Sequence, residues 1–173
     1  MLRNPLHLAA LALTALVAAG CGTASDPAAS ATIDKTKYVL ADEPPGAVGV
    51  LTAKEQAQDQ DPIVLVGQIG GQKNPWIDGQ AAFIVIDPSQ KVVADGTESA
   101  GGEVCLDDCC AEERKNCTTL VKVVDPQGKP LAMDARELLD VKENDLVVVR
   151  GKVHRNDDEG LFSISADGVY VRR

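Results

Sequence analysis

Five short apolar segments, each rich in β-branched residues, constrain what this chain can fold into more than any other feature. Such segments fit a pleated, half-buried surface, and the Gly, Pro, Asn and Asp residues between them mark turns. In the last segment the alternation of apolar residues changes register at Gly168, which indicates a β-bulge. The spacing predicts strands over residues 63–69, 81–86, 119–124, 146–153 and 161–171.

Local patterns predict what connects these strands. Residues 125–128 have aspartate first, proline second and glycine fourth, as in a type I turn. A capping box that starts at Asp134 predicts a helix of one or two turns between the third and fourth strands. A similar box at Thr52 predicts a short helix that ends near Gln58, and residues 156–160 form an acidic hairpin loop. The expected fold class is therefore all-β, with one or two short helices.

The order of three strands, a short helix and two strands resembles the OB fold, a small five-stranded barrel that is partly open. The resemblance covers about residues 50–172. It is clearest in residues 139–153, where the helix passes into the fourth strand, and in residues 64–69 of the first strand. It implies an OB-fold-like five-stranded antiparallel barrel. The residues expected among its core are Leu65, Phe83, Val85, Val121, Val148 and Ile164.

The first twenty residues have the pattern of a cleaved secretory signal. Arg3 gives a positive start, residues 8–19 are apolar and uncharged, and small residues at 18–20 precede Cys21. The apolar run is too short to span a bilayer permanently. The site resembles the bacterial lipoprotein signal, which implies that Cys21 receives a diacylglyceryl group, becomes the N-terminus and is acylated there. The alternative is an ordinary signal peptide followed by a chance cysteine.

We therefore expect a cell-envelope protein whose lipid anchor holds its domain on the extracytoplasmic side of a membrane. Gly22 follows the cysteine in place of aspartate, which favours the outer membrane in cells that have two membranes. Residues 1–20 are the cleaved signal peptide, and residues 21–45 are the lipidated N-terminus, flexible tether and arm. Residues 46–173 are one OB-fold-like domain with a Cys-rich loop at 101–118.

The charge of the chain argues against one class of partner. It has 26 acidic and 17 basic residues, a net charge of −9, and cleavage of the signal removes the basic Arg3. A chain this acidic is repelled by phosphate backbones. We therefore expect no nucleic acid among its partners.

The chain also resembles a group of uncharacterised bacterial lipoproteins. The resemblance rests on Ala-Asp-Glu-Pro at 41–44, Pro-Trp-Ile-Asp-Gly-Gln-Ala-Ala-Phe at 75–83, Asp-Pro-Ser at 87–89 and the Cys-Cys pair at 109–110. No activity is established for that group. The resemblance therefore implies a fold and a location only.

Cys105, Cys109, Cys110 and Cys117 crowd one loop between the second and third predicted strands. In an oxidising envelope such thiols form disulfides, which hold a loop that has no core of its own. Four cysteines allow three pairings. A direct bond between Cys109 and Cys110 would strain the peptide between them, so we expect these two to bond to different partners.

The alternative for these cysteines is a metal site. Four thiolates complete a tetrahedral zinc site or hold Cu(I), although the C-x₃-C-C-x₆-C spacing is not a standard zinc ribbon. The negative field of the acidic residues raises the pKa of nearby thiols and attracts cations, which leaves hard-cation binding open. No C-x-x-C is present, so thiol–disulfide exchange is the least favoured role. The acidic residues of this loop are Glu103, Asp107, Asp108, Glu112 and Glu113.

Trp76 and Asp78 are the candidate ligand-binding residues, because they lie in the loop between the first two strands, where OB folds often bind ligands. Trp76 is either a stacking platform or a cap on the barrel end. His154, the one histidine left after signal cleavage, lies beside the acidic loop 156–160, which forms either a metal site or a solvated hairpin. No phosphate-binding loop follows the glycines at 70–71.

The sequence therefore predicts no catalytic residues and no cofactor. We expect a non-enzymatic binding or structural module that contacts an unknown protein or small molecule through the Trp76 loop and the disulfide-held loop. The alternative is a zinc- or copper-binding envelope lipoprotein that uses the four cysteines.

Overall fold

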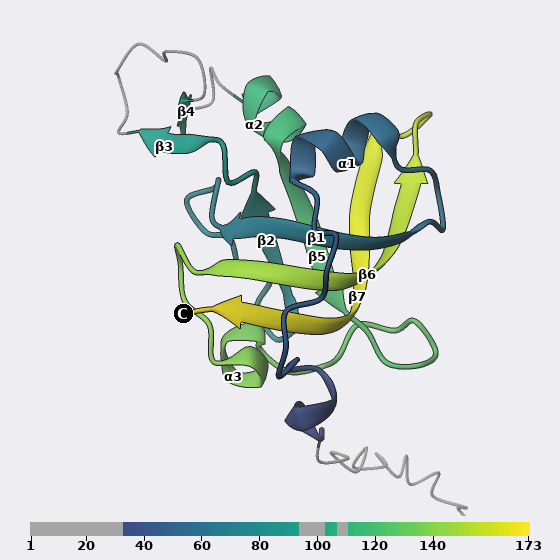
Figure 1. The fold of residues 1–173 in the computed structure, drawn as a ribbon. Helices are drawn as coiled ribbons and strands as arrows, with labels where there is room; N and C mark the ends of the chain where they lie inside the picture. Colours follow the sequence, from purple (N-terminus) through teal and green to yellow (C-terminus); the bar gives the residue numbers. More distant parts are fainter. Residues whose placement is uncertain (1–32, 94–102, 107–110) are drawn as a thin grey trace, which may run out of the picture. The chain divides into compact units, whose positions relative to one another are not determined.

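The residues described by the structure, 33–93, 103–106 and 111–173 of a computed structural model, are predominantly β-structure. Five strands form one mixed sheet in the order β1-β2-β5-β7-β6, and β6 pairs back onto β1, which closes the sheet into a barrel (Figure 1). All five strands predicted from the sequence are present, with ends that differ by at most three residues. They are β1 (Pro62–Ile69), β2 (Ala82–Ile86), β5 (Thr118–Val123), β6 (Leu146–Asn156) and β7 (Leu161–Arg172).

One pair of strands differs from the expected antiparallel barrel. β5 and β7 run parallel, with Val121 opposite Ile164, whereas the other four pairs in the barrel are antiparallel. After β5 the chain passes through a helix and β6 before it returns as β7, and a long crossover of this kind is what a parallel pair requires. The prediction of a wholly antiparallel barrel is therefore wrong at this pair.

Alternate residues of the strands fill the barrel, as the period of two in a strand dictates. In β1 the buried positions alternate with half-buried ones from Ile63 to Ile69, and Pro62 occupies the first position, where a missing amide is tolerated. The core prediction is confirmed, because all six residues have a relative exposure of 0%. They are Leu65, Phe83, Val85, Val121, Val148 and Ile164.

The β6–β7 hairpin contains the predicted bulge. Its register passes from Arg150 opposite Gly168 to Gly151 opposite Ala166, so that Asp167 is the extra residue. The side chain of Asp167 points away from the core and forms an ion pair with Arg150 at 2.7 Å. The bulge returns apolar side chains to the core on both of its sides.

Helix α3 (Ala135–Leu139) lies between β5 and β6, as predicted. The Asp134 side chain caps it by accepting the amide N–H of Arg136 at 2.8 Å. Leu138 and Leu139 are buried in the core cluster, so the short helix is held by packing as well as by its cap. The type I turn before it is also confirmed, because the Gly128 amide donates to the Asp125 carbonyl at 2.9 Å.

Helix α1 (Val50–Gln56) begins two residues before the predicted start at Thr52. Its N-cap is Gly49, which has no side chain, so the predicted capping box is wrong. The carboxylate of Asp87 supplies the cap instead, by accepting the Leu51 amide at 2.9 Å. This cap comes from a residue that follows β2, which a local sequence pattern does not reveal.

Residues 33–49 lie along the barrel before α1. They include the 3₁₀ helix η1 (Lys35–Lys37), and the backbone of Leu40 donates to the Val169 carbonyl at 2.9 Å. Val48 forms a bridge to Leu65 on β1, in the part of that strand that does not pair with β2. Tyr38 and Leu40, in the segment predicted to be an arm, are therefore hydrogen-bonded to β7.

Between β2 and β5 the chain forms elements that the sequence analysis did not predict. β3 (Lys91–Val93) and β4 (Glu103–Cys105) make a small parallel sheet, and α2 (Ala111–Cys117) leads directly into β5. Glutamates at the start of α2 and basic residues at its end suit the helix dipole. Among the described residues, no helix is long and apolar enough to cross a bilayer.

Candidate functional site

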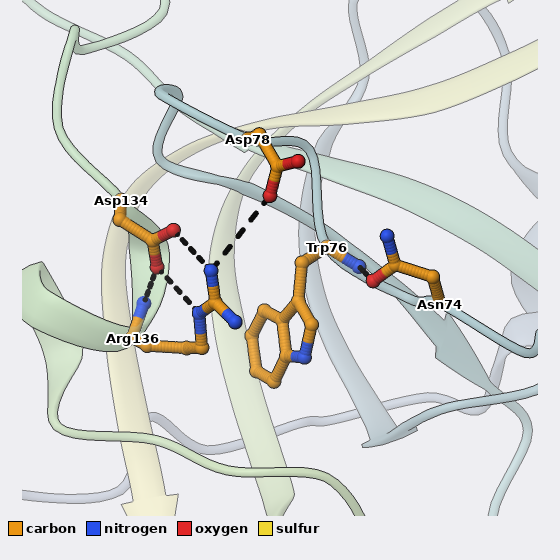
Figure 2. A network of polar contacts seen from close by, with 5 residues as sticks. All are labelled: Asn74, Trp76, Asp78, Asp134 and Arg136. Atoms are coloured by element: carbon orange, nitrogen blue, oxygen red, sulfur yellow. Dashed lines mark hydrogen bonds and ion pairs between the residues drawn. The ribbon is translucent and has the colours of Figure 1, made fainter.

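Trp76 lies beside Arg136 of α3 (Figure 2). It bridges to Phe83 of β2, their ring centroids lie 6.3 Å apart, and the tryptophan is only 7% exposed. Its amide donates to the Asn74 side-chain oxygen at 3.2 Å, which fixes the turn before it. The indole is therefore part of the core boundary.

Arg136 of α3 covers this indole (Figure 2). Its guanidinium carbon lies 5.3 Å from the ring centroid of Trp76, which is a cation–π contact. Two hydrogen bonds to the Asp134 carboxylate, at 2.8 and 2.6 Å, hold the guanidinium there, and Asp78 lies 3.8 Å from it. The bonds from Arg136 lower the pKa of Asp134 to about 2.

The structure thus brings the two predicted ligand-binding residues, Trp76 and Asp78, to one guanidinium. A ligand that stacks on this face of the indole has to displace Arg136 from Asp134. The arrangement fits the alternative in which Trp76 caps the barrel end. A ligand-binding role for Trp76 and Asp78 stays a prediction.

The cysteine loop lies partly outside the described residues, which exclude Cys109 and Cys110. Cys105 and Cys117 are both buried, and no disulfide joins them to each other. Burial raises the pKa of the Cys117 thiol, which donates to the Arg114 carbonyl at 3.4 Å. The disulfide and metal hypotheses therefore stay predictions. Among the described side chains, no group of three His, Cys, Asp or Glu residues is placed to hold a metal ion.

His154 is an exposed residue of β6. Its Nδ1 atom is 3.3 Å from the side-chain nitrogen of Gln60. Asp157, in the acidic loop, instead forms an ion pair with Arg155 at 2.7 Å. These contacts fit the interpretation of the loop as a solvated hairpin.

The surface of the barrel that includes His154 carries a groove. Two hollows, of about 310 and 430 Å³, share the lining residues Leu120, Leu161 and Phe162. We call the two together the β5–β7 groove. Its walls come from α1, α2, β5 and the β6–β7 hairpin, so segments far apart in sequence meet there.

The charge of this groove is opposite to that of the chain. Five cationic side chains and a single carboxylate line it among the described residues, whereas the whole chain has 26 acidic and 17 basic residues. The carboxylate, Asp59, accepts the Arg155 amide at 2.9 Å. The cationic residues are Lys54, Arg114, Lys115, Lys122 and Arg155.

The two arginines of the groove bond to backbone carbonyls of neighbouring elements. Arg155 donates to the carbonyls of Lys54 and Ala57, at 2.7 and 3.0 Å, and so ties β6 to the end of α1. Arg114 donates to the Cys105 carbonyl at 2.9 Å and ties α2 to β4. These two arginines therefore hold in place the elements that form the walls of the groove.

The three lysines of the groove have no carboxylate within ion-pair distance in the described part of the chain. Lys54 donates to the Lys115 carbonyl at 2.5 Å, and its ammonium lies 5.7 Å from the Phe162 ring centroid. Burial lowers the pKa of Lys54, and the nearby charge of Lys115 lowers it further. Positive charge therefore gathers here, without an ion-pair partner among the described residues.

The sequence analysis did not find this groove. The Glu-Glu-Arg-Lys order at 112–115 was a signal for α2, because acids favour the start of a helix and bases its end. Lys122 alternates with the buried Val121 and Val123, which placed it on the outer face of β5. No sequence pattern shows that these lysines lie on the same side of the barrel as Lys54.

No protein-family model matches this chain, and no curated protein matches it. The function is therefore argued from the residues and their geometry.

Proposed function

We propose that this protein is a lipid-anchored cell-envelope protein whose mature domain is an OB-like, non-enzymatic binding module, with the β5–β7 groove as its binding face. The observation that carries the binding role is the groove itself. It combines exposed apolar side chains with lysines that have no ion-pair partner among the described residues.

The strand connections support the OB-like assignment. Counting the barrel strands along the chain, the order around the sheet is first, second, third, fifth, fourth, with α3 between the third and fourth. The OB fold is a five-stranded Greek-key barrel that often binds ligands on the face of its second and third strands. Ile84 of β2 and Leu120 of β5, the second and third strands here, both line the groove.

The bonds made by the two threonines that line the groove support a non-enzymatic role. The hydroxyl of Thr118 donates to the Arg114 carbonyl at 2.7 Å, and that of Thr119 to the Phe162 carbonyl at 3.1 Å. Nucleophilic catalysis needs a hydroxyl or thiol within reach of a base. Here both threonine hydroxyls donate to backbone carbonyls.

The signal-like segment and Cys21 support the location. The experiment is expression of the full chain and of Cys21→Ser in a bacterium that processes lipoproteins, with labelled palmitate and membrane fractionation. The native chain should be labelled and stay with the membrane, while Cys21→Ser should be unlabelled and leave it. Ser25→Ala, a change in the same segment, should behave as the native chain. Equal membrane retention of Cys21→Ser would contradict the anchor.

The binding face is tested separately, in intact cells. A photo-crosslinking residue at position 161, where Leu161 is 55% exposed, should form an adduct of defined mass. The same residue at position 39, where Val39 is 40% exposed and lies outside both the groove and the Trp76 loop, is the matched control and should not. No adduct from position 161, or equal adducts from both positions, would overturn the assignment of the groove.

A further inference from the structure

We propose that the β5–β7 groove binds an acidic peptide segment of a partner protein, with carboxylates at Lys54, Lys115 and Lys122 and an apolar side chain against Leu161. This inference rests on the proposed function of the groove and names the chemistry of its ligand.

Charge complementarity is the first argument. An interface that places positive charge on an otherwise acidic protein steers acidic partners to one site and repels them elsewhere. The groove is such a site, because its lysines face solvent or are half-buried while acidic residues outnumber basic ones in the chain as a whole. A basic partner would bind the rest of the surface in preference to the groove.

The positions of Lys54 and Lys115 are the second argument. Lys54 is fixed on the Lys115 carbonyl, and the ammonium of Lys115 extends from α2 to the β6–β7 hairpin, where a side chain on Gly160 would lie 3.4 Å from it. The two ammonium groups repel each other, since the charge of Lys115 contributes to lowering the pKa of Lys54, and the repulsion falls when an anion lies near both. A carboxylate bound at this end of the groove therefore reduces the repulsion between two lysines that the fold already holds in place.

Apolar contacts favour a peptide over a small inorganic anion. Leu161 is 55% exposed, the most exposed of the large apolar residues in the described part of the chain. It lies with Leu120 and Phe162 where the two hollows meet, so an apolar group bound there has Lys115 on one side and Lys122 on the other. A peptide with an apolar side chain between acidic ones matches this order.

The same residues disfavour nucleic acid. Single strands bind through several aromatic side chains on which bases stack, together with a basic track. Phe162 is the one aromatic residue that lines the groove in the described chain, and the Lys54 ammonium lies over its ring. The cations without ion pairs are lysines, which lack the two-pronged geometry with which arginine binds phosphate.

The test uses the full-length protein in detergent and a fluorescein-labelled peptide of alternating Glu and Leu residues with Gly at its ends. A peptide with Gln in place of every Glu is the matched control. Binding is followed by fluorescence anisotropy at several salt concentrations. Oligothymidylate of similar length and vesicles containing phosphatidylglycerol are the other two probes.

The variant Lys115→Glu/Lys122→Glu reverses two groove charges, and Lys129→Glu/Lys152→Glu makes the same change of net charge at two exposed lysines outside the groove. The Glu peptide should bind in a salt-sensitive way, the groove variant should weaken it by about tenfold or more, and the control variant should change it less than about twofold. Leu161→Ser should also weaken binding, and since that side chain is exposed the fold should be unaffected.

Equal affinity for the Gln peptide, equal loss in the two double variants, or tighter binding of oligothymidylate or vesicles would overturn the acidic-peptide assignment. These outcomes leave the proposed binding face intact if position 161 still crosslinks in cells. Loss of crosslinking would count against the binding face itself.

Discussion

The carboxylate of Asp87 caps helix α1, and Gly49 leaves the space that it occupies. Asp87 Oδ2 accepts the Leu51 amide at 2.9 Å, and a Cβ atom placed on Gly49 would lie 2.5 Å from that oxygen. The backbone of Gly49 is extended, with φ −72° and ψ 167°, which any residue adopts. Glycine is therefore required here by the close approach of a side chain and not by backbone conformation.

Gly49→Ala should destabilise the protein by about 1–3 kcal/mol, because the added methyl group collides with the capping carboxylate. The measurement is urea unfolding followed by circular dichroism. An unchanged unfolding midpoint would show that Asp87 moves aside without loss.

An aspartate at the N-cap position of α1 should take over the capping role of Asp87. Asp87→Ala leaves the first amides of α1 without their acceptor and should cost about 1–2 kcal/mol. Adding Gly49→Asp to Asp87→Ala supplies a carboxylate at the N-cap position and removes the collision, so the double variant should be more stable than Asp87→Ala alone. Equal stability of the two would contradict the capping role.

The contribution of Asp87 to stability should depend on pH. Burial raises its pKa, but hydrogen bonds from Ser89 and from the amides of Leu51 and Val50 lower it more, so that the pKa lies below the ordinary 3.8. The carboxylate therefore stabilises the fold fully above pH 3.8, and this stabilisation is lost as the pH falls through the lower folded-state pKa. The difference in unfolding free energy between native protein and Asp87→Asn should be constant near neutral pH and shrink in acid. A difference that grows in acid would contradict this sign.

Arg136→Ala should expose the indole of Trp76. Since the chain has one tryptophan, its fluorescence reports this site alone. We expect emission at longer wavelength and stronger quenching by acrylamide, with a loss of about 0.5–1 kcal/mol of stability. Asp78→Asn removes only the longer contact at 3.8 Å and should leave the fluorescence nearly unchanged. Native-like quenching of Arg136→Ala would show that the guanidinium does not shield the ring.

Reduction of the predicted disulfides should loosen the region around α2 more than the barrel. Cys117 packs with Ile86 and Val104 in a small cluster that is separate from the main core. Hydrogen exchange after treatment with a reductant should therefore rise in β4 and α2 and stay slow in β1 and β6. Uniform loss of protection would show that the loop and barrel unfold together, and no change at all would argue that the cysteines carry no disulfide.

The sequence by itself determined the strands, because the alternation of apolar residues sets both their positions and their buried faces. It also determined the turn at 125–128, the bulge beside Gly168 and helix α3, since each depends on residues that are neighbours along the chain. The core prediction held for the same reason. Ile164 shows this most simply, because it lies between Ser163 and Ser165 and is the one of the three that is fully buried.

Tertiary structure decided what depends on residues far apart in sequence. Asp87 sets the start of α1. The closure of the sheet makes β5 pair with β7 in parallel. Arg136 of α3 covers the indole of Trp76. The groove has the same origin, because Lys54 and Lys122 come from α1 and β5 and line one groove only on the folded barrel. Local sequence patterns reflect steric effects and hydrogen bonds between residues that are close along the chain. The gathering of lysines from separate elements depends on how those elements pack together.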